Sequence, residues 1–200
     1  MASSFADLFD DPDLRRTIGT LPVSAKLKPG ERTPKQLTVP VKSIQPLIRS
    51  VGRVVSDLPD DEPNMVWTDG FNELVVRTDS LRLNATTGLI RLSVSVDCDQ
   101  LAKPLTVTVP FAVGTKDKVT GMVMTTFDVV EGPAAVVDLW ADAITAFCWE
   151  CVLELVRGIT AKLGNDGSGR ALIPGSLAAA PNTLIIHPMA RHKLPVATKG

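Results

Sequence analysis

A change in hydrophobic period divides the middle of this chain and constrains its fold more than any other feature. Between Asn64 and Val130 apolar and polar residues alternate, whereas from Ala134 to Leu163 apolar residues recur every three or four positions. Alternation is typical of a half-buried strand, and the longer period is typical of an amphipathic helix. We therefore expect an α+β fold in which a sheet packs against one long helix in the C-terminal half.

The clearest predicted strand runs from Leu89 to Cys98, with apolar side chains on one face and polar side chains on the other. The run from Leu81 to Ala85 precedes it across Thr86-Thr87-Gly88, which is typical of a hairpin turn. Similar alternation occurs at 71–77, 105–113 and 122–130. Because these connections are too short for parallel crossovers, we expect an antiparallel meander sheet of four to five strands.

Two helices are predicted. Pro133 suits a helix start, and the Gly-rich segment 164–169 ends the long helix that begins at Ala134. A short N-terminal helix is expected over 44–58, with Ser43 as its cap and Pro46 in its first turn. Gly52 lies inside that segment and weakens its helix propensity.

The long helix carries apolar residues on two sides. One stripe can cover the sheet, and it contains Val137, Trp140, Ile144, Phe147, Cys148, Cys151 and Leu155. Trp149, Leu153 and Val156 fall on the other side. We expect this second face to be covered either within its own domain, for example by the short helix, or by another subunit.

Prolines divide the ends of the chain from its centre. Their frequency near both termini disfavours long helices and central strands there. We expect an extended N-terminal arm over 1–40, a single α+β core domain over 41–164 and an extended C-terminal tail over 165–200. Within the tail, the run from Thr183 to His187 is strand-like, so one strand is possible there.

Both terminal arms carry features that favour binding to neighbouring proteins. The N-terminal arm has a small apolar face and an acidic start, and the tail ends with basic residues. Together with the second face of the long helix, they give these candidate partner-binding residues: Phe5, Leu8, Phe9, Asp10, Asp11, Trp149, Leu153, Val156, Arg191 and Lys193. Asp7 and Asp13 extend the acidic start, and Arg170 and Lys199 extend the basic end.

The cysteine and histidine motifs of this sequence are better explained by structural roles than by catalysis or metal binding. Cys148-x-x-Cys151 lies in the interior of the predicted helix, whereas redox and zinc motifs of this spacing lie at helix starts or in knuckles. His187 and His192 flank a proline in the tail, and no nucleophile-elbow pattern accompanies them. We therefore predict no catalytic, cofactor-binding or metal-binding residue and no cofactor.

Charge and composition limit the classes of partner. A net charge of −1 does not favour nucleic acid, and the charges within 134–163 do not favour a membrane-spanning helix. The first residues lack the pattern of a signal peptide, and three cysteines suit a reducing compartment. We expect a cytoplasmic protein, or one assembled into a particle made there.

The function that this organisation favours is a non-enzymatic structural or assembly subunit of a larger complex. A virion, a phage tail or a baseplate-like component would use such arms to bind subunits of the same or a neighbouring kind, in a homo- or hetero-oligomer. The alternative is a module that binds a small hydrophobic ligand in a cavity between the sheet and the long helix. An enzyme ranks third, because the sequence has only two His and no recognisable catalytic motif from which to assemble an acid, a base and a nucleophile.

Overall fold

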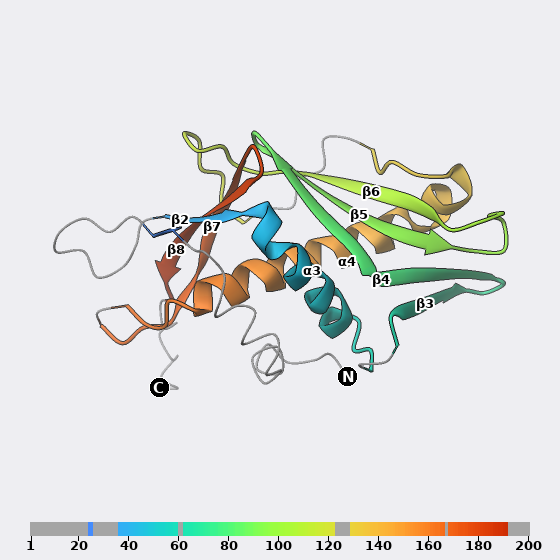
Figure 1. The fold of residues 1–200 in the computed structure, drawn as a ribbon, viewed down its shortest axis with the longest axis horizontal. Helices are drawn as coiled ribbons and strands as arrows, with labels where there is room; N and C mark the ends of the chain where they lie inside the picture. Colours follow the sequence, from blue (N-terminus) through green and yellow to red (C-terminus); the bar gives the residue numbers. More distant parts are fainter. Residues whose placement is uncertain (1–23, 26–35, 60–61, 123–128, 167, 192–200) are drawn as a thin grey trace, which may run out of the picture.

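The computed structural model describes residues 24–25, 36–59, 62–122, 129–166 and 168–191 (Figure 1). They form two antiparallel sheets and two helices, so the α+β class is confirmed. The small apolar face of the N-terminal arm, Phe5, Leu8 and Phe9, lies outside the described residues, as does most of the strand expected over 122–130.

The larger sheet is a four-stranded antiparallel meander in the order β3-β4-β5-β6, as predicted, although β3 was not among the predicted strands. Its strands are β3 (Asn64–Asp69), β4 (Asn72–Thr86), β5 (Leu89–Asp97) and β6 (Leu105–Ala112). The β4–β5 hairpin turns at Thr87–Gly88, where Gly88 has φ +72°, and this confirms the predicted turn.

β4 is one strand where the alternation indicated two. Its register against β5 shifts between Arg77 and Arg82, so a bulge joins the two predicted segments. At the bulge, the Ser80 hydroxyl donates to the Arg77 carbonyl (2.6 Å) and accepts from the Ser95 N–H (2.7 Å). The side chain thereby replaces a ladder bond, which keeps the strand continuous.

The second sheet has the order β1-β2-β8-β7 and corrects the expectation of an extended tail. Its strands are β1 (Ser24–Ala25), β2 (Leu37–Pro40), β7 (Leu172–Ala180) and β8 (Thr183–Ala190). The tail therefore holds a hairpin of two strands, of which only β8 was predicted. Leu177, Ala179 and Leu184 are fully buried, because the hairpin packs into the same core as the larger sheet.

The shorter helix, α3 (Val41–Val55), begins before its predicted start. Its N-cap is Pro40, and the Val41 N–H donates to the Asn182 carbonyl in the β7–β8 turn (2.9 Å). The predictions of Ser43 as the cap and Pro46 in the first turn were wrong, because this long-range bond satisfies the first helical N–H instead.

The long helix, α4 (Ala134–Ala161), matches its prediction closely. In Figure 1 it runs through the molecule, with α3 crossing it, the larger sheet toward one end and the β7–β8 hairpin toward the other. Ile90, Leu92, Val94 and Val96 are fully buried in one cluster with Trp140, Ile144 and Phe147. Among the described residues, no helix combines the length and apolar character needed to cross a membrane.

Candidate protein-binding surface

The turn between β3 and β4 presents a phenylalanine to solvent. Asp69 pairs with Asn72, so Gly70 and Phe71 form a two-residue turn, and Gly70 has φ +60°, a conformation that favours glycine. The relative exposure of Phe71 is 107%. At this hairpin tip, the side chain of Phe71 contributes nothing to the core of its own chain.

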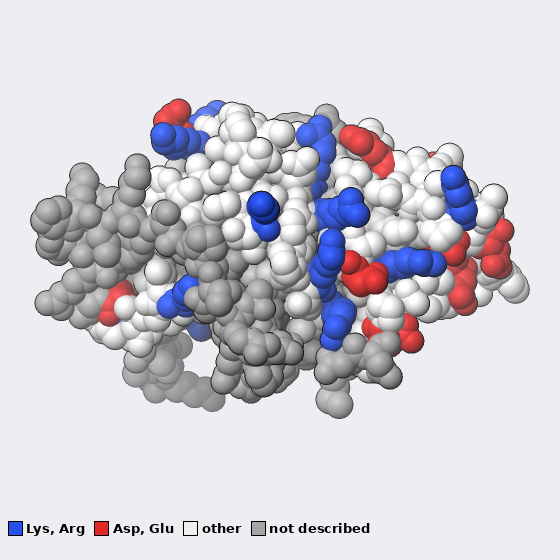
Figure 2. Space-filling model, viewed as in Figure 1, with Lys and Arg blue, Asp and Glu red and all other residues white. Residues whose placement is uncertain are grey.

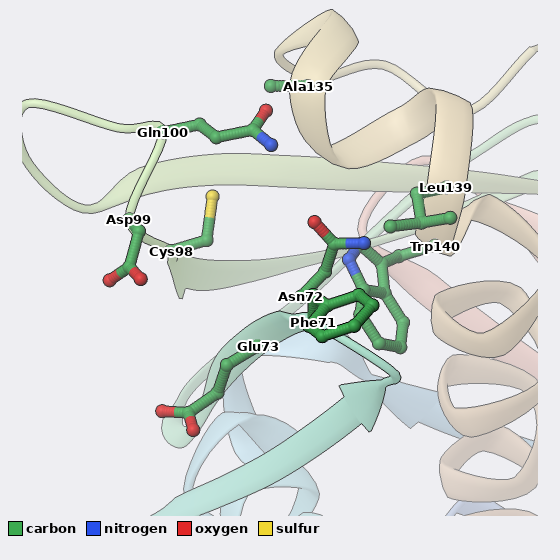
Figure 3. A pocket seen from close by; sticks show the side chains of 9 residues that line it. All are labelled: Phe71, Asn72, Glu73, Cys98, Asp99, Gln100, Ala135, Leu139 and Trp140. Atoms are coloured by element: carbon green, nitrogen blue, oxygen red, sulfur yellow. The ribbon is translucent and has the colours of Figure 1, made fainter.

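A small hollow lies beside this turn (Figure 3). Phe71, Asn72 and Glu73 reach it from the hairpin, Cys98, Asp99 and Gln100 from the end of β5, and Ala135, Leu139 and Trp140 from α4. Its volume is about 40 Å³. Pockets that bury a drug-sized ligand measure about 300–1,000 Å³, so this hollow suits a single protruding group at most.

Apolar side chains from two elements border the hollow and form what we call the tip surface: Phe71, Ala135 and Leu139. Ala135 and Leu139 are four residues apart on α4, so they lie one above the other on the face beside the hairpin. Leu139 is 45% exposed. Exposed apolar side chains that gather at one place, rather than singly, are typical of protein-binding sites.

The polar groups that border the hollow come from Asn72, Glu73, Cys98, Asp99 and Gln100. In Figure 3 the amides of Asn72 and Gln100 lie nearer its middle, and the carboxylates of Glu73 and Asp99 point outward. No histidine borders it. Within the part of the chain that the structure describes, no group of three His, Cys, Asp or Glu side chains is placed to hold a metal ion.

The predicted face of α4 is largely internal. Val156 is fully buried in the core of its own chain. Trp149 is half-buried and packs on Phe111 of β6, with 5.2 Å between ring centroids, and Leu153 is also half-buried. Residues of the same chain therefore cover this face of α4 at Trp149 and Val156.

Of the predicted arm residues, Arg191 is described and is exposed. Phe5, Leu8, Phe9, Asp10, Asp11 and Lys193 lie outside the described residues. Arg170, which was assigned to the basic end, pairs through its guanidinium with Asp166 at 2.7 Å. Hydrogen bonds from the backbone N–H and side chain of Arg170 lower the pKa of Asp166, so this part of the basic tail is neutralised locally.

Both helical cysteines are packing residues. Cys148 and Cys151 are fully buried, and no disulfide joins them. Burial raises the pKa of the Cys148 thiol to about 12, and burial is also the main cause that raises the pKa of Cys151. A buried protonated thiol is a poor nucleophile and a poor metal ligand.

A Ser–His pair that the sequence did not reveal crosses the β7–β8 hairpin. Ser176 lies opposite His187, and the Ser176 Oγ is 3.0 Å from the His187 Nδ1. Ser176 is only 4% exposed, and among the described residues His187 has no carboxylate partner to complete a triad. Burial lowers the pKa of His187. The pair therefore acts as a cross-strand hydrogen bond.

One face of the molecule carries a band of positive charge. Figure 2 shows Lys and Arg side chains following one another over α3 and β4. Lys42 and Arg49 lie seven residues apart on one side of α3, and Arg77 and Arg82 are exposed on β4. We call these four residues the basic band. Such a band can attract an acidic segment of a protein partner.

Comparison of the chain with protein-family models, curated proteins and solved structures finds no match.

Proposed function

We propose that this protein is a non-enzymatic structural or assembly subunit that binds other protein subunits through the tip surface. The full exposure of Phe71 carries the proposal, because burying a phenylalanine side chain contributes about 1.5–3 kcal/mol and the monomer leaves that contribution unused. Aromatic side chains are also enriched among the residues that dominate binding energy in protein interfaces.

The geometry of the tip surface suits a protein partner better than a small ligand. The hollow beside Phe71 is about 40 Å³, so it can accept one side chain of a partner while Phe71 enters a pocket of that partner. Between the larger sheet and α4, the ring of Trp67 lies near the rings of Trp140 and Phe147, at centroid distances of 6.2 and 6.0 Å. These rings occupy space that the alternative function would give to a ligand.

The N-terminal arm is the second part of the molecule that we propose for subunit binding. β2 pairs with β8 along its whole length, and Leu37 and Val39 are fully buried, so the core anchors the end of the predicted N-terminal arm. We propose that residues before this anchor bind neighbouring subunits through Phe5, Leu8 and Phe9. A virion, phage tail or baseplate-like particle is the kind of complex in which such arms are used.

Substitution of Phe71 by serine tests the proposal. Phe71→Ser should leave the melting temperature within about 1–2 °C of wild type, because the side chain makes little contact with its own fold. It should weaken assembly by at least tenfold, measured by light scattering across a concentration series, as expected of an interface residue worth more than about 1.4 kcal/mol.

Val119→Ser is a matched control, because Val119 is 52% exposed and does not border the hollow. It should assemble like wild type. Equal assembly by Phe71→Ser and wild type would show that the tip surface is not the binding site.

A further inference from the structure

Two outer strands of the sheets have partners along their outer edges. Thr108 of β6 exchanges two backbone hydrogen bonds with Glu131, at 2.8 and 2.9 Å. Along β7, Ala179 donates to Gly114, and Gly114 donates to Leu177. Covered edges of this kind prevent pairing with another chain.

β3 is the outer strand at the opposite side of the larger sheet from β6. The Thr78 N–H donates to the Pro63 carbonyl at 2.9 Å, so the pair Pro63–Thr78 is a hydrogen-bonded pair of the antiparallel ladder. Because such pairs alternate with non-hydrogen-bonded ones, Met65, Trp67 and Asp69 bond to β4. The backbone groups of Asn64, Val66 and Thr68 therefore point outward.

Within the described residues, one contact occupies this outward edge. The Asn64 N–H donates to the Glu62 carboxylate at 3.0 Å, which covers the beginning of the strand. The N–H and C=O groups of Val66 and Thr68 have no such partner among the described residues. Six residues long and without Lys, Arg or Pro, β3 also lacks the usual protection of an edge strand.

The side chains of β3 are apolar at its centre on both faces. Val66 lies on the outer face of the sheet, which is the face away from the core. It is 52% exposed and pairs with Val75 of β4. Met65 and Trp67 lie on the other face and pack against the core. A strand that added to this edge would find apolar side chains above and below the backbone, with polar side chains at Asn64 and Thr68.

We propose that β3 of a second copy pairs with this edge in antiparallel orientation, with the two Val66 residues opposite each other. The proposal rests on the proposed function, since it names a partner for an assembly subunit. Pairing would join the two four-stranded sheets into one continuous sheet, with a two-fold axis at Val66.

The edge matches itself in this register. The outer face gains a row of four valines, Val75 and Val66 from each copy, because Val66 already pairs with Val75. Met65 faces Trp67 of the second copy, and Asn64 faces Thr68. Asp69 falls opposite Pro63 and Glu62 opposite Gly70, so no like charges face each other directly.

The register also agrees with the direction of the backbone groups. The residues that point outward, Asn64, Val66 and Thr68, are the ones that form the hydrogen-bonded pairs when Val66 is at the centre. In this pairing the Asn64 N–H exchanges the Glu62 carboxylate for the Thr68 carbonyl of the second copy. Registers centred on Met65 or Trp67 keep the faces aligned but pair fewer outward residues. A heterologous peptide would not bring this self-complementarity, so a second copy is the partner that the observations favour.

Charge substitutions at Val66 test both the partner and the register. Val66→Lys should weaken self-association by at least tenfold in sedimentation velocity, because two lysines then face each other. An equimolar mixture of Val66→Lys and Val66→Asp chains should recover association. Thr68→Lys is the matched control, since position 68 faces Asn64, and it should associate within a few fold of wild type.

A cross-link checks the geometry without relying on affinity. Val66→Cys should form a disulfide-linked dimer on mild oxidation, because hydrogen-bonded partners have Cα atoms about 5.5 Å apart, within disulfide range. Thr68→Cys should not, since the two copies of position 68 would lie about 14 Å apart. The wild-type chain controls for Cys98, Cys148 and Cys151.

The possible results separate this inference from the proposed function. If wild type assembles but Val66→Lys and Thr68→Lys weaken it equally, or the charge-swapped mixture stays apart, the β3 pairing is wrong while an assembly role remains. If Val66→Lys affects only binding to another protein, the second copy is the wrong partner. If wild type never associates with any protein, the proposed function fails as well.

Discussion

Cys148 gives the fold a measurable dependence on alkaline pH. Its thiol is fully buried, and burial raises its pKa to about 12, whereas the unfolded chain ionises near the ordinary value of 9.0. The folded state therefore keeps a proton that the unfolded state loses. The contribution of this group to stability is complete below about pH 9 and is lost as the pH rises toward 12.

We predict that Cys148→Ala makes the free energy of unfolding fall less steeply above pH 9. The difference in slope can reach about 1.4 kcal/mol per pH unit, the value for one proton, and urea unfolding at pH 8, 9 and 10 would measure it. Val152→Ala is the control, because Val152 is equally buried on the same helix but does not titrate. Identical slopes for the two variants would mean that Cys148 ionises in the folded protein.

Phe71 shows why sequence reasoning missed the tip surface. It was assigned to the start of a strand because Phe71 to Arg77 alternates, and alternation alone does not say where a strand begins. Asp69-Gly70 is a hairpin signal that could have indicated a turn here, although it would place that turn one residue before Gly70-Phe71. The exposure of Phe71 itself follows from the turn geometry, which no local pattern fixes.

Gly52 fixes how closely α3 approaches the larger sheet. It is buried, and a Cβ added there would overlap with Cδ1 of Leu81, a fully buried side chain of β4. The glycine that weakened the prediction of this helix is therefore used for close packing, where the lost helix propensity is about 1 kcal/mol.

Gly52→Ala should lower the free energy of unfolding by about 1–2 kcal/mol despite the better helix propensity of alanine. Overpacking against a fixed neighbour typically costs about 1–3 kcal/mol, which exceeds the propensity gain. Urea denaturation would measure it, with Arg49→Ala as an exposed control on the same helix. A variant more stable than wild type would mean that Leu81 moves aside without cost.

The hydrophobic periods predicted α4, β5 and β6, because buried side chains recur along them at helix or strand spacing, and Gly88 marked the β4–β5 turn. β7 escaped prediction because its sequence, Leu172 to Ala180, contains Pro174, Gly175 and a run of three alanines, which are poor strand formers. The pairing with β8 decides its conformation. Pro181-Asn182, with Asn182 at φ +55°, is a turn signal that could have indicated the hairpin.

At the scale of the whole molecule, opposite charges lie far apart in the chain. The acidic start holds Asp7, Asp10, Asp11 and Asp13, while the basic band lies on α3 and β4 and Arg191 is exposed beyond β8. We propose that the acidic start of one subunit meets such basic residues on the next. Exposed ion pairs contribute about 0.2–1 kcal/mol each, so they would set the rate and specificity of assembly more than its affinity.

Replacement of these four aspartates by asparagine should slow assembly at low salt. Near 1 M salt, where the screening length is about 3 Å, the variant and wild type should assemble at the same rate. Stopped-flow light scattering at several salt concentrations would measure this difference. If wild type shows no salt dependence and the variant equals it throughout, the acidic start does not steer assembly.

The native mass of the wild-type chain tests the central claim most directly. Sedimentation equilibrium of the purified chain, and native mass determination of the chain in extracts of its source, would show whether it associates. We predict a mass above that of one 21.4 kDa chain, either alone in a concentration-dependent manner or in the extract. A single chain of 21.4 kDa at every concentration and in the extract would contradict an assembly role.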